Sequence, residues 1–217
     1  MRHYFQDQSI QLAKKERTRA LLIDGAIAAV AKHGLEGTSI KEITTLAGVS
    51  NGTYYNYFKT RDEALRLASK SIAEEVTNDI AQSVAILPSG LGRIVVSTLS
   101  FIDRLVKAPE WGALIVDVVY QLTDVRKIVG GHLQEDVALA IKQGDLAEMP
   151  SPFTIHQIAT LIALGIEMQI KGAQGPDVAV QTSISVLQLL GLTPTKARNT
   201  VAKYQSKVAN SRLYISR

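Results

Sequence analysis

A short segment, residues 51–58, combines side chains that could bind DNA with side chains that could anchor them. The polar members are Asn51, Thr53, Tyr55 and Asn56. Short hydroxyl and amide side chains and a phenol are suited to hydrogen bonds with phosphates and base edges. The aromatic members, at helical spacings of three and four, are Tyr54, Tyr57 and Phe58. Because these share one face of a helix, they are expected to pack inward and leave the polar side chains pointing away.

Two short helices joined by a tight turn are expected to position this segment. Ser39 and Glu42 form a capping box, in which each side chain satisfies the other residue's free backbone N–H, so the first helix begins at Ser39. Gly48 ends that helix, and Ser50 is the expected N-cap of the second. The small or apolar inner face comprises Ile40, Ile43 and Ala47, with Val49 at the junction. This arrangement is a helix-turn-helix.

The remainder of the chain also has helical periodicity, with no long stretch of period two. A first helix is expected over about 12–33, stopped by Gly34, and a second capping box, Thr60 with Glu63, opens a helix that continues to about Val84. Prolines at the starts of apolar runs then predict further helices. Their expected ranges are about 90–107, 109–122, 124–143, 152–172, 176–190 and 194–207. The predicted fold class is all-α.

Composition narrows the classes of function. The 217 residues include no cysteine, which excludes disulfides and cysteine-ligated metals. The N-terminus lacks the apolar core of a signal peptide, and the most apolar window, 155–170, is too short for a membrane span, so we expect a cytoplasmic protein with no membrane partner. Net charge is +3 over residues 1–60, −5 over 61–195 and +6 over 196–217. A basic N-terminal unit can meet a polyanion; the basic end is either a solubilising tail or a further DNA contact.

The segment from Arg19 to Leu65 resembles the DNA-binding domain of TetR-type transcriptional repressors. The resemblance lies in the run AGVSNGTYYNYF, residues 47–58, followed by Arg61 and Leu65, and it covers about a quarter of the chain. Two positions depart from the family pattern: Thr44 stands where alanine is usual, and Tyr54 where leucine is common. The resemblance implies an N-terminal three-helix DNA-binding domain (1–62) and a helical effector-binding and dimerisation domain (63–207), followed here by a basic tail (208–217).

The resemblance also implies roles for particular residues. Ser50, Asn51, Gly52 and Thr53 would lie nearest the major groove, where Gly52 lets the backbone approach closely. Thr53 and Tyr55 would bond phosphates, and Asn51 and Asn56 are candidates for base edges, adenine being a good partner of asparagine. The positions expected to clamp the DNA backbone are Lys41, Lys59 and Arg61, and a further expected DNA contact is Ser39. Further contacts are expected from Lys14, Lys15, Arg17 and Arg19.

An isoleucine stripe in the second domain recurs at spacings of three and four. With residues of the next helix it is either intramolecular core or, as the family favours, a four-helix dimer interface across a two-fold axis. The interface residues expected on this reading are Ile155, Ile158, Ile162, Ile166, Ile184 and Leu187. A dimer would also serve DNA binding, since two recognition helices must stand about 34–36 Å apart to enter successive major grooves.

A small-molecule pocket is the expected switch. Asp117 and Glu167 stand in apolar helices, so each either faces a cavity, pairs with a neighbour or reaches solvent. The candidate lining is Phe101, Trp111, Asp117, Tyr120, Glu167 and Met168. His132, Glu135 and Asp136 share a helix face that could bind a metal, but we expect a solvated face there, with no metal and no cofactor.

The sequence therefore predicts a homodimeric, ligand-responsive repressor that binds a palindromic operator. Two alternatives stay open: an activator or non-specific DNA organiser of the same fold, and a helical enzyme using Asp117, Glu167 or His156. No coherent nucleophile–base set supports the enzyme.

Overall fold

The computed structural model describes residues 14–119, 123–172 and 177–210, and every regular element in these ranges is an α-helix. The helices that form one end of the molecule are α2 (Lys14–Gly37), α3 (Ile40–Ala47), α4 (Asn51–Tyr55) and the start of α5 (Arg61–Val84). The body is made by the rest of α5 and by α6 (Gly90–Lys107), α7 (Pro109–Val119), α8 (Thr123–Lys142), α9 (Pro152–Ile170), α10 (Val178–Leu189) and α11 (Pro194–Asn210).

Local capping fixes the ends of the short helices as the sequence predicts. The Ser39 hydroxyl accepts the Glu42 N–H (3.3 Å), and the Ser39 N–H donates to the Glu42 carboxylate (2.7 Å). These bonds from Ser39 also hold the pKa of Glu42 below its ordinary value. Gly48 ends α3 with a φ of 67°, a left-handed conformation that glycine adopts without strain, and Ser50 caps α4. The helix-turn-helix is therefore confirmed, turn included.

Two predicted helix ends need adjustment. The first helix begins at Lys14 among the described residues and continues to Gly37, although Gly34, at φ 71° and ψ 172°, breaks its geometry where the stop was expected. The Thr60 hydroxyl caps α5 as predicted, by accepting the Glu63 N–H. The Glu63 carboxylate, however, accepts the N–H of Lys59 rather than that of Thr60. In this second capping box, the backbone N–H that donates to the Glu63 carboxylate is therefore one residue earlier than predicted.

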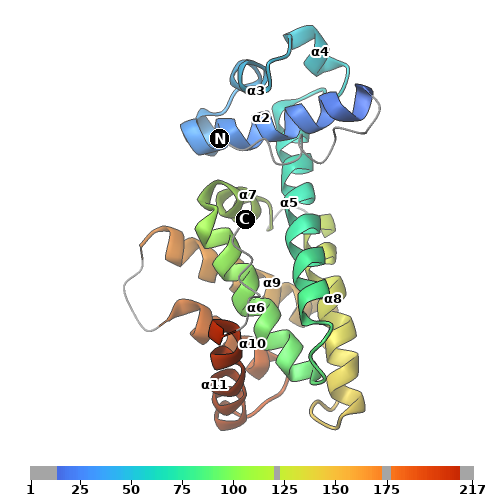
Figure 1. The fold of residues 1–217 in the computed structure, drawn as a ribbon, viewed down its shortest axis with the longest axis vertical. Helices are drawn as coiled ribbons and strands as arrows, with labels where there is room; N and C mark the ends of the chain where they lie inside the picture. Colours follow the sequence, from blue (N-terminus) through green and yellow to red (C-terminus); the bar gives the residue numbers. More distant parts are fainter. Residues whose placement is uncertain (1–13, 120–122, 173–176, 211–217) are drawn as a thin grey trace.

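Figure 1 shows α3 and α4 as the outermost elements at one end, lying beyond α2, with α5 running from that end into the body. Within α2, Gly25 permits close packing on α3, since a Cβ there would lie 2.7 Å from the carbonyl oxygen of Ile43. One helix of the body, α7, contacts α2 as well as α5, α6, α8 and α9. A single connected core of buried apolar side chains runs through both parts. Helix α5 crosses the expected domain boundary near residue 62. Among the described residues, no linker separates the N-terminal helices from the body.

Helix α9 is apolar on two sides. Among the described residues it alone has the length and apolar composition of a possible membrane span. Its inner side, which includes Ile158, Ile162 and Ile166, is buried in the core of the body. Packing on that side explains much of its apolar composition, so the composition does not by itself indicate a membrane segment.

Candidate DNA-binding surface and ligand cavity

The outer side of α4 and the turn after it present polar side chains to solvent. Asn51 and Asn56 are exposed, and Tyr55 is 58% exposed. Tyr54 and Phe58 lie on the opposite side and are buried, with their ring centroids 5.5 Å apart. The predicted inward packing is present for Tyr54 and Phe58, whereas Tyr57 is half-buried. Because α4 ends at Tyr55, Tyr57 and Phe58 follow the helix and do not share a helical face with Tyr54 as predicted. The outer polar side is held on a rigid core by the aromatic side chains.

Tyr54 makes a hydrogen bond that leucine, the residue common at this position in the TetR-type pattern that this segment resembles, could not make. Its hydroxyl donates to the carbonyl of Thr60 at 2.8 Å. Burial raises the pKa of Tyr54 to about 12, so the phenol keeps its proton at neutral pH. This bond joins Tyr54, near the end of α4, to Thr60, the residue that caps α5.

Several polar side chains of α4 are hydrogen-bonded to one another or to α3. The Ser50 and Thr53 hydroxyls lie 2.9 Å apart, and the Ser50 hydroxyl also accepts the Thr53 N–H. The hydroxyl of Thr44, on α3, donates to Oδ1 of Asn51 at 2.8 Å. Thr53 is half-buried and Thr44 is buried. These polar groups are therefore partly engaged before any DNA arrives, whereas Tyr55 and Asn56 have no hydrogen bond from their side chains to other described residues.

The expected backbone-clamping residues and Ser39 fall into two groups. Ser39, Lys41 and Lys59 are exposed around α3 and α4. Arg61 is instead occupied: its guanidinium donates to Asp62 at 2.9 Å and to the carbonyls of Leu35 and Thr38 at 3.4 and 3.3 Å. Arg61 therefore joins the start of α5 to the end of α2. Lys14, Lys15, Arg17 and Arg19, at the start of α2, are all exposed.

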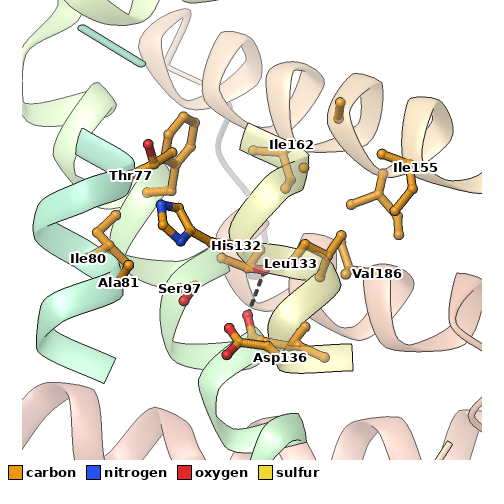
Figure 2. Close-up of a pocket in the computed structure, with 16 residues that line it drawn as sticks. Thr77, Ile80, Ala81, Ser97, His132, Leu133, Asp136, Ile155, Ile162 and Val186 are labelled. Carbon is orange, nitrogen blue, oxygen red and sulfur yellow. Dashed lines mark hydrogen bonds between the residues drawn. The ribbon is translucent and has the colours of Figure 1, made fainter. Parts of the chain in front are cut away.

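A cavity lies in the body between α5, α6, α8, α9 and α10, and contains about 650 Å³ of empty space, part of it open to solvent. Figure 2 shows side chains from these helices converging on it. Most of the wall is aliphatic or aromatic, with Phe101 on α6. The polar side chains in the wall are Thr77, Ser97, Thr98, His132 and Asp136. Apolar walls with a few polar groups are typical of small-molecule sites.

Asp136 is the buried charge of this cavity. Its residue is 7% exposed, and its carboxylate lies 3.8 Å from a guanidinium nitrogen of Arg93. Burial raises the pKa of Asp136 to about 6, the Arg93 charge opposing that rise and the Glu135 charge adding to it. Arg93 is fixed by bonds to the carbonyls of Leu87 (2.8 Å) and Ala85 (2.7 Å). The cavity thus holds an acceptor whose protonation changes near neutral pH.

His132 and Ser97 are the other polar groups able to meet a ligand. Nε2 of His132 lies 3.3 Å from the amide oxygen of Asn78 on α5. The hydroxyl of Ser97 makes no hydrogen bond to another described residue, whereas those of Thr77 and Thr98 donate to carbonyls of their own helices. Ser97 therefore has an uncommitted donor in the wall.

The predicted pocket residues are mostly elsewhere. Phe101 lines the cavity. Asp117 is exposed on α7, Glu167 pairs with Lys171, and Met168 is 42% exposed. Trp111 is half-buried on α7, outside the cavity wall, and Tyr120 lies outside the described residues. Sequence reasoning missed Asp136 and His132 as pocket residues. Their spacing of four on one helix face was visible, but was interpreted as a solvated surface.

The isoleucine stripe proposed for the dimer interface turns inward. Ile158, Ile162, Ile166 and Leu187 are buried within the single chain, and Ile158 and Ile162 line the cavity. These four side chains are therefore core and cannot meet a partner in this arrangement. Ile155 and Ile184 are half-buried. The outward stripe of α9 carries Phe153, Gln157, Thr160, Leu164 and Met168, all exposed.

Neither a metal site nor a catalytic set forms in the part of the chain that the structure describes. No group of three His, Cys, Asp or Glu side chains there is placed to hold a metal ion. His156 and Glu167 are eleven residues apart on α9, or about 16 Å along the helix axis. Asp117 lies on α7 and is exposed. The three residues considered for an enzyme do not lie along a common wall of the cavity.

Comparison with known proteins agrees with the geometry of the N-terminal end. The family model for bacterial regulatory proteins of the tetR family matches residues 22–68. The HTH-type transcriptional regulator PksA of Bacillus subtilis (strain 168) is 35% identical over 65 residues, 30% of this chain and 32% of PksA. The chain thus aligns with about a third of the length of that relative.

Solved structures resemble nearly the whole fold. RolR in complex with resorcinol superposes with a TM-score of 0.71 at 21% identity, covering 88% of this chain and 95% of RolR. FadR of Bacillus subtilis in complex with stearoyl-CoA gives 0.59 at 16% identity, covering 79% and 97%. The matching family model describes bacterial regulatory proteins, and PksA and FadR both carry the name of a transcriptional regulator.

Proposed function

We propose that this chain, a TetR-type regulator, is a homodimeric repressor that binds a palindromic operator and releases it when a small molecule enters the cavity of the body. The observation that carries the proposal is the exposed polar face of α4, anchored by buried Tyr54 and Phe58 at one end of the molecule. An aromatic-backed polar helix in a helix-turn-helix is suited to the major groove.

DNA recognition is assigned to α4 and its surroundings. The contact set is Ser39, Lys41, Ser50, Asn51, Gly52, Thr53, Tyr55, Asn56 and Lys59, with Arg61 acting through the α2–α5 junction. Exposed Tyr55 is the strongest candidate for a phosphate contact, because its hydroxyl has no bond to a described residue. Phosphate contacts fix the register of the protein on the duplex, and base contacts select the sequence.

Selection of bound duplexes from random DNA tests this assignment. We expect a discrete sequence with two related half-sites. Replacing Thr53 and Tyr55 together by alanine should abolish binding, while circular dichroism and oligomeric state stay unchanged. Gln134→Ala, at an exposed position on α8, is the matched control and should bind as the wild type does. Unchanged affinity of the double variant would remove Thr53 and Tyr55 from the contact set.

The dimer interface is assigned to the outward stripe of α9 together with the outward side of α10, which includes half-buried Ile184. Leu164 and Met168 are 44% and 42% exposed on that stripe, and large apolar side chains grouped on one helix face favour a protein partner. Leu164→Glu should convert dimers to monomers in analytical ultracentrifugation. Ile86→Glu, at an 81% exposed position between α5 and α6, should stay dimeric. A dimeric Leu164→Glu variant would place the interface elsewhere.

The effector is expected to be a largely apolar molecule with one or two hydrogen-bonding groups that meet Asp136, His132 or Ser97. The complexes of RolR with resorcinol and of FadR with stearoyl-CoA support small-molecule binding by a protein of this fold. Release of DNA requires that the ligand bind one arrangement of the dimer better than the other, commonly by about 1–3 kcal/mol. A compound screen read by loss of operator binding tests this. Asp136→Ala should weaken the response to any effector found without weakening DNA binding.

An activator or a non-specific DNA organiser of the same fold remains the competing function. The basic exposed side chains at the start of α2 would serve either one. Footprinting separates the classes, because an organiser protects no discrete site. An activator would protect a site but raise transcription from the adjoining promoter in a purified system.

A further inference from the structure

Thr44 is placed to control which chemical group Asn51 shows to DNA. Thr44 is 3% exposed, on the side of α3 that faces α4. Its hydroxyl reaches across the turn to the amide oxygen of Asn51, the first residue of α4, at 2.8 Å. Asn51 itself is exposed on the proposed recognition surface. A buried residue therefore bonds directly to the side chain of a candidate base-reading residue.

The position of the Thr44 hydroxyl is fixed from both sides. The backbone carbonyl of Thr44 accepts the N–H of Val49 at 3.0 Å, which holds the turn between the helices. The hydroxyl also lies 3.0 Å from the carbonyl of Lys41, one turn earlier in α3. A hydroxyl has a single hydrogen, so donation to Asn51 competes with donation to the Lys41 carbonyl, and the contact to Oδ1 of Asn51 is the shorter of the two. The amide oxygen of Asn51 is thus turned inward and its NH2 group outward.

This orientation conflicts with the pairing expected from the sequence. Asparagine pairs with adenine by using both ends of its amide, the oxygen accepting from N6 and the nitrogen donating to N7. With its oxygen engaged by Thr44, Asn51 presents only donors. Guanine shows two adjacent acceptors, O6 and N7, in the major groove, whereas the major-groove edge of cytosine shows an N4 donor. An outward NH2 group therefore matches guanine better than adenine.

We propose that Thr44 is a specificity-determining positioning residue, which orients Asn51 so that the base facing it is guanine. The proposal rests on the proposed function, because it requires α4 to enter the major groove. It depends on a residue that departs from the family pattern: alanine, usual at position 44, has no hydroxyl and would leave the amide free to turn. The operator preference of this chain at that base pair is thus set from α3, outside the recognition helix.

Selection from random duplexes with three variants tests the proposal. Wild type and Thr44→Ser, which both keep a hydroxyl, should enrich guanine at one base pair of each half-site. Asn51→Ala identifies that pair by losing the preference there. Thr44→Val keeps the branched shape of the side chain and removes the hydroxyl, so it should fold, dimerise and bind. At the same pair, its guanine-to-adenine ratio should fall by about fivefold, which corresponds to about 1 kcal/mol, the lower end of the discrimination given by a good base contact.

Three results would overturn the proposal. One is a Thr44→Val preference identical to that of Thr44→Ser; another is a shift at a base pair that Asn51→Ala does not affect. The third is adenine at the Asn51 pair in the wild type. In each of these cases a discrete operator is still selected, so the proposed repressor function stands. If the wild type enriches no sequence at all, the proposed function fails, and the role of Thr44 fails with it.

Discussion

Replacing Asp136 by asparagine should remove a pH dependence from the stability of the protein. The pKa of Asp136 rises from 3.8 to about 6 on folding, mainly because the carboxyl is buried. Between these values the folded protein binds more protons than the unfolded chain, so this contribution to stability is full below about pH 4 and is lost as the pH rises to about 6. The difference corresponds to about 3 kcal/mol, since each pKa unit is worth about 1.4 kcal/mol.

Asparagine has a similar shape and cannot ionise, so Asp136→Asn avoids this loss. Arg93 keeps its bonds to the carbonyls of Leu87 and Ala85 and is not left unpaired. Relative to the wild type, the variant should therefore gain about 2 kcal/mol in free energy of unfolding between pH 4 and pH 7, since part of the wild-type loss has already occurred at pH 4.

Urea unfolding of both proteins at one protein concentration, from pH 4 to pH 7, measures this difference. Titrating groups that the substitution does not touch cancel when the variant is compared with the wild type at each pH. Glu148→Gln is the control, because the Glu148 carboxylate is exposed and forms no ion pair with a described residue. The control should change the free energy by less than about 0.5 kcal/mol. A constant difference between Asp136→Asn and the wild type across this range would show that burial of Asp136 does not perturb its titration.

Three further outcomes are expected. Tyr54→Phe removes the donor to the Thr60 carbonyl and should lower the free energy of unfolding in urea by about 1 kcal/mol, whereas Tyr57→Phe, whose hydroxyl has no bond to a described residue, should not. Gly25→Ala places a Cβ 2.7 Å from the Ile43 carbonyl oxygen and 2.8 Å from the Ala47 Cβ. This clash should lower the free energy of unfolding in urea by about 2 kcal/mol and weaken operator binding. A variant as stable as the wild type would show that α2 and α3 can move apart there at little cost. Operator affinity, measured by fluorescence anisotropy, should fall steeply as the salt concentration rises. In the variants Lys41→Ala and Lys59→Ala, the slope of log K against log salt should become shallower by about 0.9 for each phosphate that is no longer neutralised. A slope near zero would exclude phosphate binding by this surface.

The helix ends could be predicted from the sequence because their causes are local. Ser39 with Glu42, Ser50 before α4, and Thr60 before α5 each satisfy backbone groups within three or four residues. The helix-turn-helix follows from these caps and from Gly48. Where the cause is not local, the prediction was less accurate. The Glu63 carboxylate bonds the N–H of Lys59, a choice between two neighbouring donors that depends on how the chain enters α5.

The packed side of α9 could not be predicted from periodicity. Spacing identifies residues that share a face, but α9 carries apolar residues on two faces. The isoleucine stripe is the inner one, against α6, α7 and α10, and the stripe with Leu164 and Met168 is the outer one. Which face of α9 packs against the rest of the chain depends on how several helices pack together. The prediction for the dimer interface named mainly inner residues for this reason.

The cavity depends on contacts between distant helices in the same way. Asp136 is buried because α6 lies close to α8: at Gly90, a Cβ would lie 2.5 Å from the carbonyl oxygen of Asp136. Nothing within α8 alone distinguishes Asp136 from Glu135, its exposed neighbour. The small residue at position 90 permits this approach, but the helix that packs against it cannot be read from the sequence.

The continuity of α5 gives the molecule a mechanical property. On α5, Thr77 and Ala81 line the cavity. Arg61 begins the same helix at the end near α4; it precedes Thr77 by 16 residues and Ala81 by 20. The intervening rod is about 24–30 Å long. If a bound molecule tilts this rod by about 5° around its cavity end, the far end swings by about 2–3 Å, and in a symmetric pair the two swings add or cancel according to their direction. In the proposed dimer, a bound small molecule would therefore change the separation of the two α4 helices without unfolding any helix.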